Sequence, residues 1–236
     1  MSTSQAQRQD FRHELRNTRC WDRQTQAIFD AQGEALEDCV LQNREELIAL
    51  CELIERLELR SYLEIGAWTG ALTRCLDGLF HFDTIAVCDD GWAEKRGLEL
   101  RLPPRATLFR GDSGSPMFET WRASLGHMDL VFIDANHAYH AVSKDFAINR
   151  RHPHRLLAFH DITGANRHTT GVRRFWQGIH QGVRHEILRP HHEIGLEHSV
   201  MGIGLWAVRP PETTGWSPAG SASTPCKDSP TTGEVR

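Results

Sequence analysis

Between residues 62 and 181, five short apolar runs alternate with longer amphipathic segments, and this alternation restricts the fold more than any other feature of the sequence. Short apolar runs of this kind are typical of strands buried on both faces of a parallel sheet. A helix after each strand supplies the right-handed crossover that parallel pairing requires. We therefore expect an α/β fold built on a doubly wound sheet. The runs span residues 62–65, 84–88, 106–109, 130–133 and 156–159.

Helical spacing of apolar residues predicts the remaining elements. Two later strand-like segments, 186–188 and 202–208, leave no room for a helix between them and predict an antiparallel hairpin at the edge of the sheet. The total is then seven strands. Helices are expected at residues 39–57, 69–80, 91–100, 115–125, 139–149 and 170–181.

The sequence divides into three parts. Residues 1–37 are polar and predict an N-terminal extension of one or two loosely packed helices. Residues 38–209 hold the alternating pattern and form the expected main domain. Residues 210–236 contain prolines among many Ser, Thr and Gly residues, a composition typical of a disordered tail.

Charge and cysteine content narrow the function classes. The formal net charge of −4 argues against a general attraction to nucleic acid but leaves open a local basic patch. The six cysteines form no CxxC pair, which favours reduced thiols and a cytoplasmic protein. No apolar run fits a signal peptide or an anchor, so no membrane association is expected. The sequence leaves open whether the chain forms a homo-oligomer.

The residues after each apolar run are the candidates for a site, because ligands of open α/β sheets bind beyond the carboxyl ends of the strands. The first run leads into a loop that contains Glu64, Gly66, Thr69 and Gly70. The glycines let the backbone approach a ligand, and the carboxylate suits an amine-bearing one. Packing is the alternative explanation, since a strand–turn–helix corner needs glycine in any α/β protein.

Polar side chains also follow the second and third runs. Asp89 and Asp90 end the second, where either carboxylate is placed to accept hydrogen bonds from ribose hydroxyls. Asp112 and Ser113 follow the third. That pair suits the edge of an adenine, or a cap on the following helix.

The fourth and fifth runs end in the most specific signals. Asp134 follows the fourth run directly with His137 three residues later, and His160 and Asp161 end the fifth. Neighbouring strands lie about 5 Å apart, so Asp134 and Asp161 are placed to share one divalent cation. As alternatives, Asp134 caps a helix and His160 is an ordinary interior histidine.

Together these motifs resemble the class I S-adenosylmethionine-dependent methyltransferases, a Rossmann-like family. The resemblance is greatest to bacterial O-methyltransferases of small molecules and sugars, with catechol O-methyltransferase more distant. It implies a seven-stranded, mostly parallel sheet with the last strand antiparallel, and O-methylation of a small hydroxylated metabolite or sugar. The motifs are ExGxxxG, the acidic end of the second strand, GDS, FIDANH, FHD and GIGLW.

The resemblance also implies residue roles. Glu64, Gly66, Thr69 and Gly70 would surround the methionine part of S-adenosyl-L-methionine. The ribose would lie against Asp90 or Asp89, and the adenine against Asp112 and Ser113.

Metal-dependent members of the family hold magnesium at this edge of the sheet. By resemblance Asp134, His160 and Asp161 are the candidate metal ligands, and His137, with Asp134, the candidate catalytic pair. Imidazole is a poor magnesium ligand, so His160 favours manganese or another transition metal, or a role without metal.

Other function classes remain open at this point. One is a metal-dependent oxygenase built on Asp134, His137, His160 and Asp161. Another is a non-catalytic cofactor-binding module with the same fold. A nicotinamide-dependent oxidoreductase is disfavoured, because the first glycine of GxGxxG is missing and Glu64 lies inside the loop.

Overall fold

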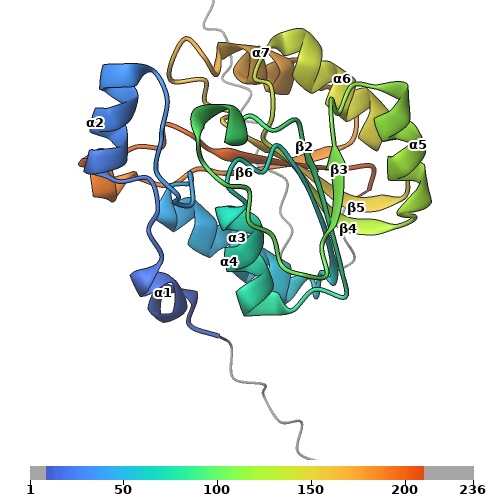
Figure 1. The fold of residues 1–236 in the computed structure, drawn as a ribbon, viewed down its shortest axis with the longest axis horizontal. Helices are drawn as coiled ribbons and strands as arrows, with labels where there is room; N and C mark the ends of the chain where they lie inside the picture. Colours follow the sequence, from blue (N-terminus) through green and yellow to red (C-terminus); the bar gives the residue numbers. More distant parts are fainter. Residues whose placement is uncertain (1–8, 210–236) are drawn as a thin grey trace, which may run out of the picture.

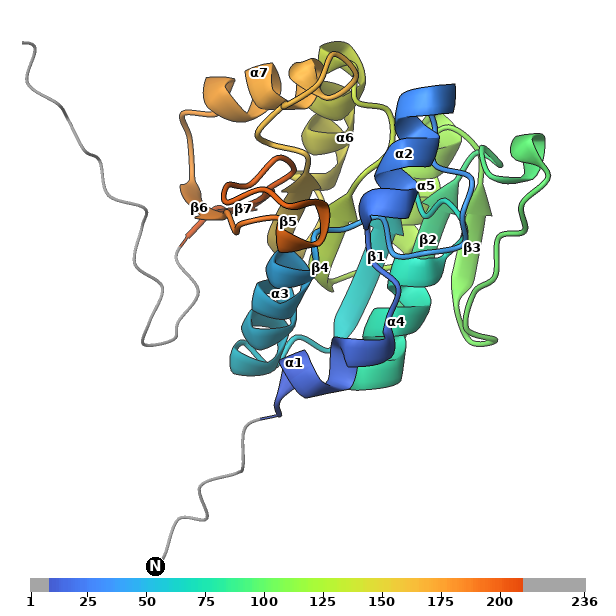
Figure 2. The same cartoon turned by 90° about the vertical axis from the view of Figure 1, so that its left-hand side faces the viewer.

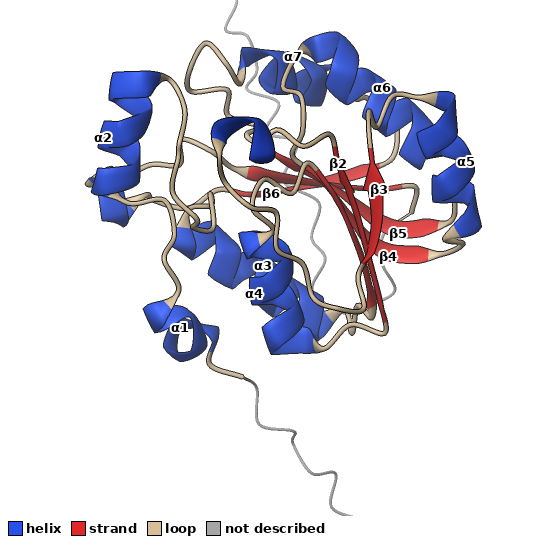
Figure 3. Cartoon of the chain, viewed as in Figure 1, coloured by secondary structure: helices blue, strands red, loops and turns tan. Residues whose placement is uncertain are grey.

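This computed structural model describes residues 9–209, in which one seven-stranded sheet carries helices on both faces (Figures 1 and 3). The strand order is β3-β2-β1-β4-β5-β7-β6. β7 runs antiparallel to both of its neighbours, and the other strand pairs are parallel. The predicted doubly wound sheet is confirmed. Its strands are β1 (Ser61–Ile65), β2 (Thr84–Asp89), β3 (Thr107–Arg110), β4 (Met128–Ile133), β5 (His154–His160), β6 (Val183–Ile187) and β7 (Ile203–Ala207).

Two helical layers bury the two faces of the sheet (Figures 1 and 2). Side chains alternate between the faces along each strand, so Tyr62 and Leu63 of β1 belong to two separate apolar clusters. One layer contains α3 (Arg44–Arg56) and α4 (Ala71–Phe80). The other contains α5 (Pro116–Ser124), α6 (Tyr139–Asn149) and α7 (Thr170–Gly178).

Two predictions around β2 and β3 are wrong. Residues 91–100 form only a 3₁₀ turn, η2 (Glu94–Arg96), because Gly91 and Gly97 both adopt left-handed φ angles that interrupt a helix. β3 is mostly exposed rather than buried on both faces. As the edge strand it pairs only with β2, so one side of the strand faces no neighbour.

The N-terminal segment is packed more firmly than its polar composition predicts. It contains α1 (Phe11–Glu14), η1 (Leu15–Asn17) and α2 (Arg23–Gln32). Phe11 and Leu15 are buried in the apolar cluster under α3 and α4, so loose packing is wrong for α1. The domain boundary at residue 37 stays a prediction.

Some predictions concern the chain as a whole. Within residues 9–209 no helix is both long and apolar enough to cross a membrane. Five cysteines there are free thiols, whereas Cys226 and the predicted disordered tail, 210–236, lie outside the described residues. The cytoplasmic location and the absence of nucleic-acid binding stay predictions.

Candidate functional site

The glycine loop after β1 lies directly against the end of β4. The Asp134 amide donates to the Ile65 carbonyl over 2.9 Å, and the Gly66 amide donates to the Cys88 carbonyl over 2.8 Å. A Cβ on Gly66 would clash with the Asp134 carbonyl oxygen, and Gly66 has a φ of 84°. Glycine is therefore required here, and the loop and Asp134 form one continuous edge.

Asp89 and Asp90 have different roles in the structure. The buried Asp89 carboxylate accepts from the Ala67, Trp68 and Gly91 amides at 3.0, 3.2 and 2.7 Å, and so holds the glycine loop. Asp90 is half-exposed and lies 3.4 Å from the Lys95 ammonium. Of the two carboxylates, only Asp90 remains accessible to a ligand.

Glu64 is a buried carboxyl group at the end of β1. It accepts hydrogen bonds from the Tyr62 hydroxyl at 3.0 Å and from the Thr73 hydroxyl. Burial raises the pKa of Glu64 to about 8 although both hydroxyls act to lower it. Among the described residues it makes no ion pair, which leaves it suited to a cationic group of a ligand.

The part of the N-terminal segment around Asp38 lies against the glycine loop. Thr69 is buried beside Asp38, whose carboxylate lies 3.1 Å from Arg74 of α4. A Cβ on Gly70 would clash with the Arg101 carbonyl oxygen, so the connection between β2 and β3 also lies against the glycine loop. Asp38 is a residue of this site that the sequence did not indicate.

Asp112 and Ser113 do not cap the following helix, because Ser115 is the N-cap of α5. Asp112 accepts from the Gly114 amide at 2.8 Å. The Ser113 hydroxyl acts to lower the pKa of the buried Asp145 of α6, against the effect of burial, which raises it to about 6. The capping alternative is therefore excluded, and the adenine role stays a prediction.

The ends of β4 and β5 bring four predicted residues together. His137 Nε2 lies 3.2 Å from Asp134 Oδ1 and 3.7 Å from Asp161 Oδ2. His160 Nδ1 lies 3.1 Å from Asp134 Oδ2 and 3.8 Å from Asp161 Oδ2. Ala138, not Asp134, is the N-cap of α6, so the helix-capping alternative for Asp134 is also excluded.

Three of these residues form a set suited to a metal ion. Asp134, His137 and Asp161 each offer one ligand atom, and these atoms lie within 4.8 Å of one another. Asp161 has a φ of 60°, a strained value for a non-glycine residue that is typical of functional sites. His160 faces the same carboxylates, but its Nε2 is buried with no partner among the described residues, so it is not a satisfied interior histidine.

Opposite charges stabilise one another in this cluster. Burial favours neutral forms, but His160 and His137 lower the pKa of Asp134 well below its usual range. The carboxylates in turn raise the pKa of His160 to about 10 and also raise that of His137, against the effect of burial. The cluster is thus arranged to keep Asp134 ionised and available to a cation.

Gln42, which the sequence did not indicate, completes this cluster. Its side chain is 2% exposed, and its Nε2 donates to Asp134 Oδ2 at 3.3 Å. Its Oε1 is buried without a partner among the described residues. Because a carboxylate only accepts, the amide must point its N–H group at Asp134 and its oxygen elsewhere.

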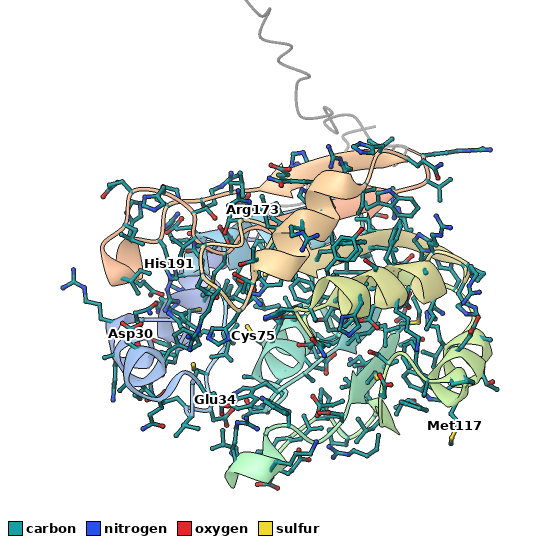
Figure 4. The ribbon with its side chains drawn as sticks, turned by 90° about the horizontal axis from the view of Figure 1, so that it is seen from above. Asp30, Glu34, Cys75, Met117, Arg173 and His191 are labelled. Carbon is teal, nitrogen blue, oxygen red and sulfur yellow. The ribbon has the colours of Figure 1, made fainter. Side chains whose placement is uncertain are left out.

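The N-terminal segment and the loop before β7 cover this end of the sheet. The buried Glu46 of α3 accepts from the Arg189 and Gly202 amides at 3.3 and 2.9 Å. His191 Nε2 lies 3.1 Å from the Trp21 carbonyl, between the two segments (Figure 4). An apolar cluster joins them further out; its buried residues are Trp21, Ala35 and Met201.

Comparison with known proteins gives one family match, in the middle of the chain. Residues 63–162 match a family model described as "Methyltransferase domain". A comparison with curated proteins gives no match.

Among solved structures, an O-methyltransferase from Bacillus cereus in complex with SAH is 13% identical, with a TM-score of 0.51 over 79% of this chain and 98% of that one. An O-methyltransferase of tomaymycin synthesis from Streptomyces achromogenes, in complex with SAM, is 16% identical, with a TM-score of 0.53 over 86% and 92%. At this identity the likeness shows the fold. The family match over residues 63–162 and the shared fold both support the resemblance to class I methyltransferases.

Proposed function

We propose that this protein transfers the methyl group of S-adenosylmethionine to a hydroxyl oxygen of a small molecule, assisted by a divalent metal ion. The observation that carries the proposal is the junction of two sites at one edge of the sheet. The glycine loop and Asp134 are in direct backbone contact, and Asp134 in turn contacts His137 and His160. A methyl donor on the loop would therefore lie next to an acceptor bound at the cluster.

The cofactor would extend along the ends of β1, β2 and β3. Glu64 offers a buried carboxyl group for the amine of the methionine part, and Asp90 an accessible carboxylate for the ribose hydroxyls. Ser113 and Asp112 would meet the adenine. The sulfonium supplies the methyl group, and the transfer is an in-line displacement that depends mainly on positioning.

His137 is the proposed general base. It lies between the two carboxylates at the edge of the cluster and is partly exposed, so it can reach an acceptor that binds there. Asp134 and Asp161 orient the imidazole by holding Nε2. In the neutral state the ring takes the proton from the acceptor hydroxyl as the oxygen attacks.

The residues present fit a divalent metal ion. Two partly buried carboxylates and one imidazole converge within 4.8 Å, and this mixed donor set favours manganese or another transition metal over magnesium. Asp134, His137 and Asp161 would hold the ion, with His160 as a further candidate. A bound metal would orient the acceptor oxygen and lower its pKa, and where the metal takes His137 another group must serve as the base.

The oxygenase alternative is less well supported. The three ligand atoms that converge within 4.8 Å come from two carboxylates and one histidine, so His160 would have to join them to supply the second histidine of the facial triad of iron oxygenases. The match over residues 63–162 is to a methyltransferase domain.

The proposal is tested first by calorimetric titration of metal-stripped protein with S-adenosylmethionine and S-adenosylhomocysteine, with and without added Mg²⁺ or Mn²⁺. We expect micromolar binding of both compounds and no binding of NAD. Hydroxylated metabolites are then screened as acceptors by the formation of S-adenosylhomocysteine. If neither compound binds under any condition, the proposal is wrong.

A further inference from the structure

α7 and the loop before it carry basic side chains that the reaction described above does not use. Arg167, Arg173 and Arg174, here called the arginine patch, are all exposed. Among residues 9–209 none of the three forms an ion pair with a carboxylate. Residues 162–185 contain no Asp or Glu, although the whole chain has a formal net charge of −4. The arginine patch is therefore a local positive charge with which no neighbouring carboxylate pairs.

The arginine patch lies next to the acceptor side of the site. α7 packs along α6 (Figures 1 and 2), and a Cβ on Gly171 would clash with the His137 carbonyl oxygen, so the first turn of α7 lies directly against the segment after β4. The Gly164 amide donates to the Asp161 carbonyl at 3.1 Å, which closes a turn after β5. The aliphatic stem of Arg173 (Figure 4) packs on Gly164. The start of α7 thus contacts both loops that carry the proposed metal ligands.

A second contact places Arg174 near the same loops. Its guanidinium carbon lies 5.3 Å from the centre of the Tyr139 ring, a cation–π contact at the start of α6. Tyr139 is 47% exposed and follows His137 by two positions. An aromatic ring holds a guanidinium group without removing its charge or using its N–H donors. Arg174 therefore remains able to bind an anion close to the proposed general base.

Helix α2 borders the arginine patch on another side. The Phe29 ring of α2 meets the His168 ring edge-on, with 5.9 Å between the ring centres. Phe29 also packs against the apolar cluster that contains Trp21 and Met201. A molecule bound between these elements would therefore meet apolar side chains as well as the arginines.

We propose that the methyl acceptor is an anion, a hydroxylated molecule with a phosphate ester or similar oxyanion that binds Arg173 and Arg174 while its hydroxyl lies at His137. The inference rests on the proposed function and names its class of acceptor. Guanidinium groups bind such oxygens through paired N–H donors. An anchor away from the reacting hydroxyl would hold that hydroxyl in line with the methyl donor, and positioning of this kind is the main source of rate in such a transfer.

A small anion fits the arginine patch better than a nucleic acid does. The patch consists of three side chains at the start of one helix, and α2 borders it through the contact of Phe29 with His168. Binding along a phosphate backbone needs many cationic contacts, whereas this chain has a net negative charge. Two or three guanidinium groups suffice for a single phosphate or diphosphate group.

The test is a calorimetric titration of the full chain with inorganic pyrophosphate, without metal and with saturating S-adenosylhomocysteine. The double variant Arg173→Gln/Arg174→Gln should bind pyrophosphate at least about tenfold more weakly than the wild type, the effect of losing charge-assisted hydrogen bonds. The matched control is Arg56→Gln/Arg150→Gln, which removes the same charge from exposed positions at the other ends of α3 and α6. This control should bind pyrophosphate as the wild type does. All three proteins should bind S-adenosylhomocysteine equally.

The other outcomes separate the two proposals. If S-adenosylhomocysteine does not bind, the proposed function fails. If it binds but pyrophosphate does not, or if both double variants lose pyrophosphate affinity alike, the proposed function stands and the anionic acceptor is wrong. A single-stranded RNA oligonucleotide is the third probe: if it binds more tightly than pyrophosphate and loses affinity only in Arg173→Gln/Arg174→Gln, the arginine patch is a nucleic-acid surface and the inference is overturned.

Discussion

The two halves of the site are built in different ways. On the cofactor side, at the ends of β1, β2 and β3, the contacts span fewer positions: Asp89 holds Ala67, 22 positions away, and Asp38 binds Arg74, 36 positions away. On the acceptor side, at the ends of β4 and β5, Asp134 contacts Gln42 across 92 positions, and His191 contacts Trp21 across 170. The acceptor side therefore depends on segments outside residues 63–162, the part that matches the methyltransferase domain.

The two sides also neutralise their carboxylates differently. Asp89 accepts from three backbone amides at 2.7 to 3.2 Å, and its one ion-pair partner among the described residues, Arg110, is further away at 3.8 Å, so its charge serves mainly to shape the loop. Asp134 instead lies among ionisable side chains whose pKa values it raises. Changes on the acceptor side should therefore affect chemistry and metal binding, and changes on the cofactor side should affect cofactor affinity.

The largest effect is expected for Asp134→Asn and Asp161→Asn. Loss of a carboxylate from the metal set removes several kcal/mol of transition-state stabilisation, so turnover should fall by about 10³-fold or more. The affinity for S-adenosylhomocysteine, measured by calorimetry, should change little. An equal loss of cofactor affinity in both variants would contradict the division between the two sides.

His137→Gln should have the next largest effect. Removal of a general base typically lowers the rate by about 10²-fold or more, and glutamine keeps a hydrogen-bonding group next to Asp134. The measurement is kcat in the presence of saturating cofactor and Mn²⁺. His140→Gln, on the exposed start of α6, is the matched control and should keep the wild-type rate. A wild-type rate in His137→Gln would remove His137 from the mechanism.

The separation along the sequence between contacting residues also decides how much of each side could be predicted. The order of strands and helices follows from local periodicity, and α6 has the predicted bounds, residues 139–149. The polar residues after β1, β4 and β5 could be assigned to a site because parallel strands end at one edge. These predictions use only residues that are near one another in the sequence or related by sheet geometry.

Other residues carry no such signal. Glu46 is a charged residue in α3, and its charge alone predicts an exposed side chain. It is buried because the amides of Arg189 and Gly202, about 150 positions further along the chain, donate to its carboxylate. Gln42 and Asp145 look like ordinary surface residues in the sequence for the same reason. Their burial is set by which segments fold over them, a property of tertiary structure that local patterns do not contain.

Gln42→Met tests the long-range contact on the acceptor side. Methionine keeps the volume but removes the N–H group that orients Asp134, and loss of such an outer contact typically weakens metal binding by about 10- to 100-fold. The measurement is Mn²⁺ affinity by titration, with S-adenosylhomocysteine affinity as the internal control. Gln24→Met, on α2 of the same N-terminal segment, is the matched surface variant. If Mn²⁺ affinity is unchanged, Gln42 does not position Asp134.

Glu64→Gln should have the smallest effect, about tenfold on cofactor affinity, because it removes the charge offered to the amine but keeps a polar group of the same size.

The pKa of Glu64 is raised to about 8 in the folded protein, so between its ordinary value and pH 8 the folded state binds more protons than the unfolded state. Stability should therefore fall as pH rises through that range, and the variant should be stabilised relative to the wild type at pH 8 but not at pH 4.5. Melting temperatures of both proteins at the two pH values measure this. A bound cofactor amine would stabilise the carboxylate, so S-adenosylhomocysteine should narrow the difference at pH 8. If the ligand leaves that difference unchanged, Glu64 does not meet the amine, and the cofactor side is held by backbone contacts alone.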